Sequence, residues 1–155
     1  MQDYKKVLNY SFLLLRYRPR SKQEIIERLN RKKYPAAVID KVMRSLEENR
    51  YINDEEFVRL YVSSSLNRGW GRKRIDYTLK KFGISEGLRS SALKNKQPFK
   101  EKLRDLVQKK ISGKPRDRKA YQKIIRSLAA KGFDYEDIIR ELEVCGFNKP
   151  RFSNE

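Results

Sequence analysis

The sequence contains no histidine and a single cysteine, Cys145, and these two shortages exclude several kinds of site. Catalysis through an imidazole needs histidine, a zinc site of the common type needs several cysteines or histidines, and an internal disulfide needs a second cysteine. The seven glycines form neither a phosphate-binding loop nor a dinucleotide fingerprint. We therefore expect no metal and no cofactor. Cys145 fits the apolar spacing around it, which predicts a buried structural thiol.

Carboxylates are the remaining catalytic option, since Asp54, Glu55 and Glu56 are consecutive. Three acidic residues in a row are also typical of the first turn of a helix, where negative charge complements the helix dipole. We favour that structural interpretation. The sequence therefore predicts a protein that is not an enzyme and that acts by binding.

Long apolar runs are absent as well. The stretch 11–15 is far shorter than the roughly 20 residues that a membrane-spanning helix needs, and the residues before it do not form a signal peptide. We expect a soluble, cytoplasmic protein with no membrane partner.

Positive charge is abundant. The 155 residues include 38 Lys and Arg but only 20 Asp and Glu, which gives a net charge of +18, while 38% of the residues are hydrophobic. This apolar content is enough for a folded core. An excess of basic residues of this size favours an acidic partner, such as a nucleic acid or an acidic protein surface.

Helical spacing dominates the apolar pattern, and it repeats over a long distance. An isoleucine and a leucine stand four residues apart three times along the chain, and the three isoleucines are separated by 50 and 49 residues. A period of this size indicates tandem structural repeats. No alternation typical of strands is found. The three pairs are Ile25 and Leu29, Ile75 and Leu79, and Ile124 and Leu128.

Similar residues follow the second and third pairs. Gly83 and Gly132 are predicted to end a helix in the left-handed conformation, an apolar residue follows each glycine, and Ser85 and Asp134 are expected to cap the next helix. In the first repeat Lys33 replaces the glycine. Ser21 with Glu24, and Asn53 with Glu56, have the spacing of N-terminal capping boxes.

The expected fold is all-α, an elongated and curved tandem array of three three-helix repeats. Their boundaries are predicted at 3–50, 53–95 and 98–147, with a C-terminal tail over 148–155. The basic excess is spread over all three, at +7 for residues 1–50, +5 for 51–97 and +6 for 98–155. Such a distribution suits a long polyanionic partner better than a single pocket.

Within each repeat the basic residues are concentrated at the corner between the first and second helices. One arginine alone is best explained as a solvated surface charge, but recurrence at the same corner favours contact with phosphates or with an acidic protein. The candidate partner- or DNA-binding residues are Arg16, Arg18 and Arg20 in the first corner, Arg68, Trp70, Arg72, Lys73 and Arg74 in the second, and Lys114, Arg116, Arg118 and Lys119 in the third.

Trp70, the only tryptophan, lies between Gly69 and Gly71 in the second corner. It is a candidate to stack on a base or to anchor in a partner's pocket. Packing in the joint between two repeats is an equally good interpretation, because the flanking glycines would allow a tight corner.

These motifs together resemble the RecX regulatory proteins of bacteria, which modulate the RecA recombinase. The resemblance is carried by segments 16–21, 46–48, 51–57, 68–71 and 128–133, together with the repeated Ile and Leu positions. Asn53, Trp70 and Lys33 depart from the usual pattern, in which an aspartate, a tyrosine and a glycine are common. The motifs are specific as an ordered set rather than singly.

The resemblance implies a monomeric regulator that binds the RecA–single-stranded DNA filament and inhibits its recombinase, ATPase and coprotease activities. It also implies single-stranded DNA and, as a further candidate, duplex DNA as partners. Two alternatives remain open on the residues alone. The short turns between second and third helices also suit a helix-turn-helix DNA-binding protein, and the charge suits a nonspecific nucleic-acid-binding protein.

Overall fold

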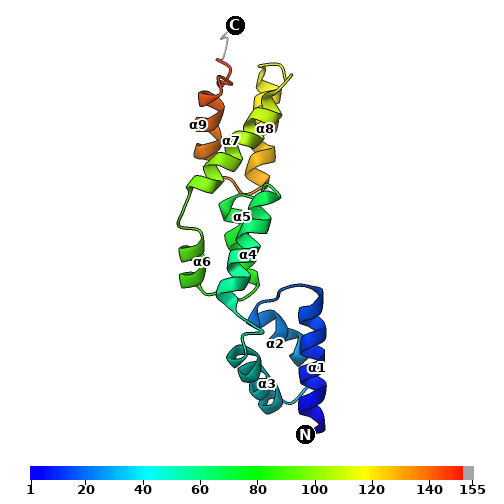
Figure 1. Ribbon diagram of the computed structural model, residues 1–155. Coiled ribbons are helices and arrows are strands. Elements are labelled where there is room, and N and C mark those ends of the chain that lie inside the picture. The colour runs from blue at the N-terminus through cyan, green and yellow to red at the C-terminus, as the bar shows by residue number, and fades with distance from the viewer. Residues whose placement is uncertain (152–155) are drawn as a thin grey trace. The chain divides into compact units, whose positions relative to one another are not determined.

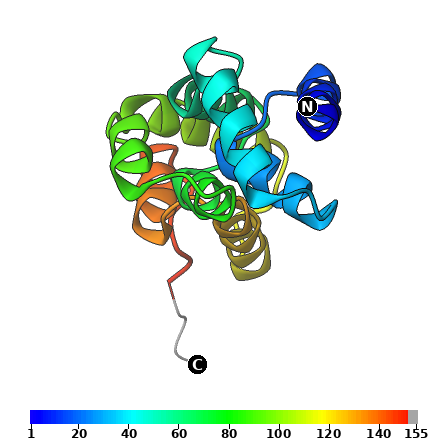
Figure 2. The ribbon, with the colours of Figure 1, turned by 90° about the horizontal axis from the view of Figure 1, so that it is seen from below.

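The computed structural model describes residues 1–151, and in this part of the chain all the regular structure is helical (Figures 1 and 2). The predicted C-terminal tail therefore lies partly outside the described residues. The all-α fold is confirmed. The helices are α1 (Gln2–Tyr17), α2 (Lys22–Arg31), α3 (Ala36–Glu48), α4 (Asp54–Asn67), α5 (Arg72–Lys81), α6 (Glu86–Ala92), α7 (Gln97–Ile111), α8 (Arg118–Ala130) and α9 (Tyr135–Val144).

Side-chain caps fix where several helices begin. The Ser21 hydroxyl accepts a hydrogen bond from the Glu24 amide, and the Glu24 carboxylate accepts one from the Ser21 amide, so the predicted capping box of α2 is confirmed. Asn53 Oδ1 accepts from the Glu56 amide at the start of α4. The first turn of α4 contains Asp54 and Glu55 as well, as the structural interpretation of the acidic cluster predicts.

The second helix of each repeat (α2, α5 and α8) is followed by a residue with a left-handed backbone conformation, as expected. Gly83 and Gly132 have φ angles of +74° and +95°, and Lys33 adopts +59° at the position where the glycine is missing. The apolar residues after the two glycines, Ile84 and Phe133, are buried and pack back on the helix ends.

The capping prediction is confirmed for Ser85 and wrong for Asp134. Ser85 Oγ accepts a hydrogen bond of 3.4 Å from the Leu88 amide. Asp134 is at the N-cap position of α9 but makes no side-chain cap. Its carboxylate lies 2.6 Å from Lys73 Nζ instead. A charged partner outside the helix replaces the local amide in this case.

The chain divides into two compact units, residues 1–61 with 78–92, and residues 62–77 with 93–155. In the first unit α1, α2 and α3 pack together around Val7, Ile25, Leu29, Val42 and Leu46. Phe57, Tyr61 and Phe82 form an aromatic group in the same unit, with ring centroids 5.5–5.9 Å apart.

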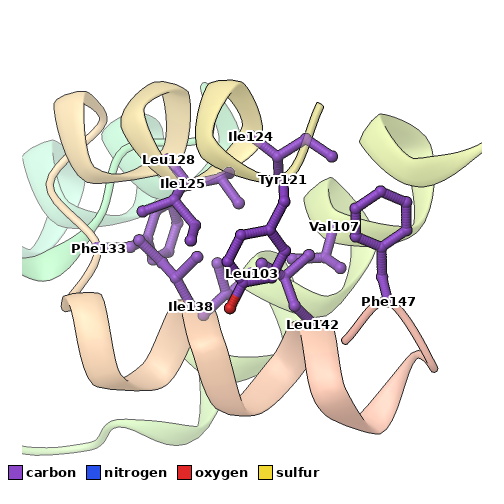
Figure 3. Packing of buried hydrophobic residues seen from close by; sticks show 10 residues of the cluster. All are labelled: Leu103, Val107, Tyr121, Ile124, Ile125, Leu128, Phe133, Ile138, Leu142 and Phe147. Atoms are coloured by element: carbon purple, nitrogen blue, oxygen red, sulfur yellow. The ribbon is translucent and has the colours of Figure 1, made fainter. Parts of the chain in front are cut away.

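In the second unit α7, α8 and α9 enclose an apolar core (Figure 3). The repeated pair Ile124 and Leu128 extends from α8 into it, and Leu103, Ile138 and Leu142 contribute from the neighbouring helices. All six repeated Ile and Leu side chains are buried, with exposed fractions of 0–6%. The period of about 50 residues therefore reports the same buried helix position three times.

Candidate functional site: the basic corners

The first corner lies where α2 begins, and the start of α2 packs on the end of α5. The Ser21 hydroxyl donates a hydrogen bond of 2.6 Å to the Phe82 carbonyl oxygen. Gly83 lies against Gln23 so closely that a Cβ on the glycine would be 2.5 Å from the Gln23 Cβ. The N-terminus of α2, the second helix of the first repeat, therefore packs on the C-terminal turn of α5, the second helix of the next repeat.

The second corner has the same joint, made with backbone alone. Gly71 is equivalent to Ser21, since each stands four residues before its repeat isoleucine. Its amide donates a hydrogen bond of 2.7 Å to the Lys131 carbonyl oxygen, and the Lys73 amide donates one of 3.1 Å to that of Gly132. A Cβ on Gly71 would lie 2.3 Å from the Gly132 carbonyl carbon. Gly71 is thus required because two backbones meet there.

Ion pairs hold the side chains of the first corner. The Arg18 guanidinium contacts both oxygens of Glu24, at 2.5 and 3.4 Å, and lies 5.8 Å from the centroid of the Phe82 ring. Arg20 turns inward, donates a hydrogen bond of 3.0 Å to the Leu14 carbonyl oxygen, and is only 10% exposed. Burial, followed by the neighbouring Arg18, lowers the pKa of Arg20. Arg16 is exposed near the end of α1.

In the second corner two arginines stack on Trp70. Trp70 occupies the position of Arg20, and Arg74 the position of Glu24. The Arg68 and Arg74 guanidinium carbons lie 4.7 and 4.0 Å from the centroid of the Trp70 ring. Arg68 also donates to the Ser64 carbonyl oxygen and to the Ser65 hydroxyl. Two arginine side chains therefore lie against one indole ring, and cation–π attraction favours this orientation of their guanidinium groups.

Arg72 and Lys73 lie beside this cluster but have different surroundings. Lys73 pairs with Asp134 at the start of α9. Arg72 is half-buried, lines a small cleft with Phe99, Asp134 and Asp137, and its Nε has no hydrogen-bond partner. The second corner thus contains the Lys73 ion pair, the half-buried Arg72 and a pair of arginines stacked on Trp70.

The third corner is a loop between α7 and α8. Arg116 donates a hydrogen bond of 2.5 Å to the Gly146 carbonyl oxygen and so ties the loop to the end of α9. Asp117, which is equivalent to Arg18 and Arg68, caps α8 by accepting from the Ala120 amide. The basic side chains of this corner are exposed. They are Lys114, Arg116, Arg118 and Lys119.

The corners differ in how much positive charge they offer. In the first, Glu24 compensates Arg18 and Arg20. In the second, the equivalent residue Arg74 is a further basic residue beside Arg68, and both guanidinium groups lie against the Trp70 ring. Guanidinium groups with a fixed orientation are suited to bidentate contact with phosphate or carboxylate oxygens. The second corner holds two such groups on one aromatic ring.

Three sequence profiles match the chain in order: RecX, first three-helix domain, over residues 8–46; RecX, second three-helix domain, over 53–93; and RecX, third three-helix domain, over 100–142. Together they cover well over half of the sequence. The chain belongs to the RecX family. This assignment confirms the resemblance and the fold of three-helix domains.

Relatives named "Regulatory protein RecX" occur in distant bacteria. The one from Bacillus velezensis is 33% identical over 149 residues, and the one from Chlorobium phaeobacteroides is 31% identical over 142. Each alignment covers 91% of this chain. It covers 56% of the Bacillus protein and 94% of the Chlorobium protein, so this chain spans little more than half the length of some RecX relatives. Their common name supports a regulatory role, and it agrees with the expectation that the chain is not an enzyme.

The fold is also that of solved RecX structures. The crystal structure of RecX from Lactobacillus salivarius superposes with a TM-score of 0.80 at 26% identity, over 94% of this chain and 97% of that one. Within residues 1–151, no helix has the length and apolar character needed to cross a membrane.

The recurrence of arginines pointed to the corners, but two features of these corners were not inferred from the sequence. One is the backbone joint between Gly71 and Lys131, which connects residues 60 positions apart. The other is the exchange of an Arg20 and Glu24 pair for a Trp70 and Arg74 pair. Alignment of the repeats on their isoleucines would have revealed the exchange, since both pairs stand at fixed distances from Ile25 and Ile75.

Proposed function

We propose that this RecX-family chain regulates a RecA recombinase by binding the RecA–single-stranded DNA filament, and that binding lowers ATP hydrolysis, strand exchange and coprotease action. The family assignment supports the regulatory role. The observation that carries the choice of surface is the cluster of Arg68, Trp70 and Arg74 in the second corner, where two guanidinium groups lie 4.7 and 4.0 Å from one indole ring.

A filament repeats both its protein surface and its phosphates. The chain has basic residues in all three corners and a net charge of +18, so it suits an extended anionic partner. Arg68 and Arg74 supply the oriented contacts, and the exposed basic groups of the first and third corners, among them Arg16 and Lys119, add attraction that depends on salt. Arg20 is left out of the proposed surface because its side chain is directed inward.

The direct test is co-sedimentation with RecA filaments, with and without single-stranded DNA, together with RecA's DNA-dependent ATPase. The full chain should sediment with the filament at moderate salt and lower the ATPase rate. No co-sedimentation and an unchanged rate at micromolar protein would contradict the proposal. Selection of an enriched duplex sequence would favour the helix-turn-helix alternative instead.

A triple variant tests the surface. Arg68→Ala, Arg72→Ala and Arg74→Ala together should weaken filament binding strongly, while helical circular dichroism is retained. The control removes three exposed arginines of the first domain, Arg28, Arg31 and Arg44, and so lowers the net charge by the same amount. Equal weakening by both triple variants would mean that bulk charge, rather than the second corner, binds the filament.

A further inference from the structure

A second basic site lies away from the second corner, on the third three-helix domain. A hollow of about 350 Å³ opens between α8, the start of α9 and the segment around Lys149. Its volume is within the range of small-ligand sites in proteins, about 300–1,000 Å³. The cleft beside Arg72 is much smaller, at about 30 Å³.

Basic residues are prominent in the lining of this hollow. Among the residues that the structure describes, Arg118, Arg126 and Lys149 are three of the eight that line it. Arg118 and Arg126 are two turns apart on α8, and Lys149 approaches from the segment after α9. Three cations from two segments that converge on one cavity are suited to a ligand with several negative oxygens.

Two tyrosines complete the hollow. The Tyr121 side chain extends from α8 toward α9, as Figure 3 shows, and its ring lies parallel to that of Phe147, with an interplanar angle of 4°. Burial, then the nearby Tyr135 and Glu143, raise the pKa of Tyr121. Tyr135, at the first position of α9, is 57% exposed and also lines the hollow. An exposed aromatic ring among cations is the pattern that binds bases and phosphates of single strands.

The sequence builds this hollow by lengthening one helix. α2 and α5 begin three residues before their repeat isoleucines, whereas α8 begins six residues before Ile124. The extra turn follows from the Asp117 cap, which accepts from the Ala120 amide. Arg118 lies on this extra turn, which α2 and α5 do not have, and lines the hollow. The site is therefore particular to the third domain.

We propose that this hollow is a binding site for one nucleotide unit of single-stranded nucleic acid. The base stacks on Tyr135, and the flanking phosphates contact Arg118, Arg126 and Lys149. The site acts without RecA, so it does not depend on the proposed filament function. An acidic peptide would use the three cations but would gain little from the exposed ring, and this difference makes the two ligands distinguishable.

The test compares two probes on the full chain, a short fluorescent oligothymidylate and an abasic strand with the same number of phosphates. Tyr135→Ala should weaken oligothymidylate binding roughly tenfold, as expected for loss of one stacked base. It should leave abasic binding unchanged. Tyr135→Phe keeps the ring and should bind both probes like the unaltered chain. If Tyr135→Ala leaves oligothymidylate binding unchanged, or weakens both probes equally, the proposal is wrong.

A charge variant and a cross-link complete the test. Arg126→Ala should weaken both probes more than Lys123→Ala, which removes an exposed charge from the same helix outside the hollow. A strand carrying iododeoxyuridine should cross-link to Tyr135 on irradiation. Cross-linking at Trp70 alone, or displacement of oligothymidylate by poly-glutamate as effectively as by unlabelled strand, would overturn the proposal. Filament co-sedimentation of Tyr135→Ala reports separately on the proposed function.

Discussion

The backbone amide of Gly71 donates a hydrogen bond of 2.7 Å to the carbonyl oxygen of Lys131, and this contact joins the start of α5 to the end of α8. The equivalent joint at the start of α2 uses the Ser21 side chain on the Phe82 carbonyl oxygen. The same geometrical relationship is therefore made once with a side chain and once with backbone. One joint is formed by the N-terminus of α2 and the C-terminal turn of α5, and the other by the N-terminus of α5 and the C-terminal turn of α8. Helix α5 therefore takes part in both.

Gly71→Ala should be strongly destabilising, because its Cβ would lie 2.3 Å from the Gly132 carbonyl carbon and the contacting atoms are backbone. A loss of about 2–4 kcal/mol in the free energy of unfolding is expected from such a steric conflict. Urea unfolding followed by circular dichroism measures it.

Gly87→Ala is the matched control. Gly87 is inside α6, has nothing within 4 Å of an added Cβ, and has no left-handed φ. Stability should be unchanged or rise by up to about 1 kcal/mol, because alanine is the better helix former. Equal destabilisation by both variants would refute the steric account of the joint.

Local signals explain how much of the fold could be predicted. The repeated Ile and Leu positions, the Ser21 capping box and the left-handed glycines depend on a few neighbouring residues, and each was predicted from its spacing. The Gly71 joint depends on residues 60 positions away, so no local pattern contains it. Asp134 was misassigned for the same reason, since Lys73 draws its carboxylate away from the helix end.

The candidate site likewise has some features that local sequence predicts and others that only the tertiary fold determines. The concentration of basic residues at the corners is visible in the sequence, and the structure places most of these side chains at the surface. Their partners are set by the tertiary fold. Nothing local distinguishes Arg20, which turns inward to the Leu14 carbonyl oxygen, from Arg18, which remains at the surface. The basic hollow beside Tyr135 brings together residues from three segments and has no sequence signature of its own.

Ser21→Ala should cost about 1–3 kcal/mol of unfolding free energy. The hydroxyl both accepts from the Glu24 amide and donates to the Phe82 carbonyl oxygen, so one substitution removes a helix cap and leaves a partly buried carbonyl without its donor. Ser85→Ala is the comparison, since Ser85 makes a single long cap of 3.4 Å at an exposed site. Thermal unfolding should rank Ser21→Ala as the less stable variant, and the opposite ranking would contradict the double role of the hydroxyl.

The two guanidinium groups beside Trp70 should be energetically coupled to the ring. Double-mutant cycles that pair Trp70→Ala with Arg68→Ala, or with Arg74→Ala, are expected to give coupling energies of about 0.5–1 kcal/mol each. Trp70→Phe retains an aromatic face and should keep part of the coupling. Because Trp70 is the only tryptophan, its fluorescence reports unfolding in the arginine variants. Coupling energies near zero for both cycles would show that the arginines lie near the ring without being held by it.

The single thiol provides a pH-dependent prediction. Burial, and then the nearby Glu141 carboxylate, raise the pKa of Cys145, while Arg104 lowers it. The thiolate is the form that reacts with iodoacetamide, so the alkylation rate of the folded chain should rise at higher pH than that of the unfolded chain. Glu141→Gln removes a negative charge and should move the midpoint to lower pH, whereas Arg104→Ala should move it to higher pH.

The raised pKa of Cys145 also makes the free energy of unfolding depend on pH. The contribution of the thiol to stability is fully present below the thiol pKa of the unfolded chain, and it is lost as pH rises through the pKa of the folded chain. The structure leaves Cys145 only partly buried, so the predicted full burial is wrong. Identical midpoints for the folded and unfolded chains would refute an effect of this partial burial on the thiol, and a shift of Glu141→Gln to higher pH would refute the assigned direction of the carboxylate's effect.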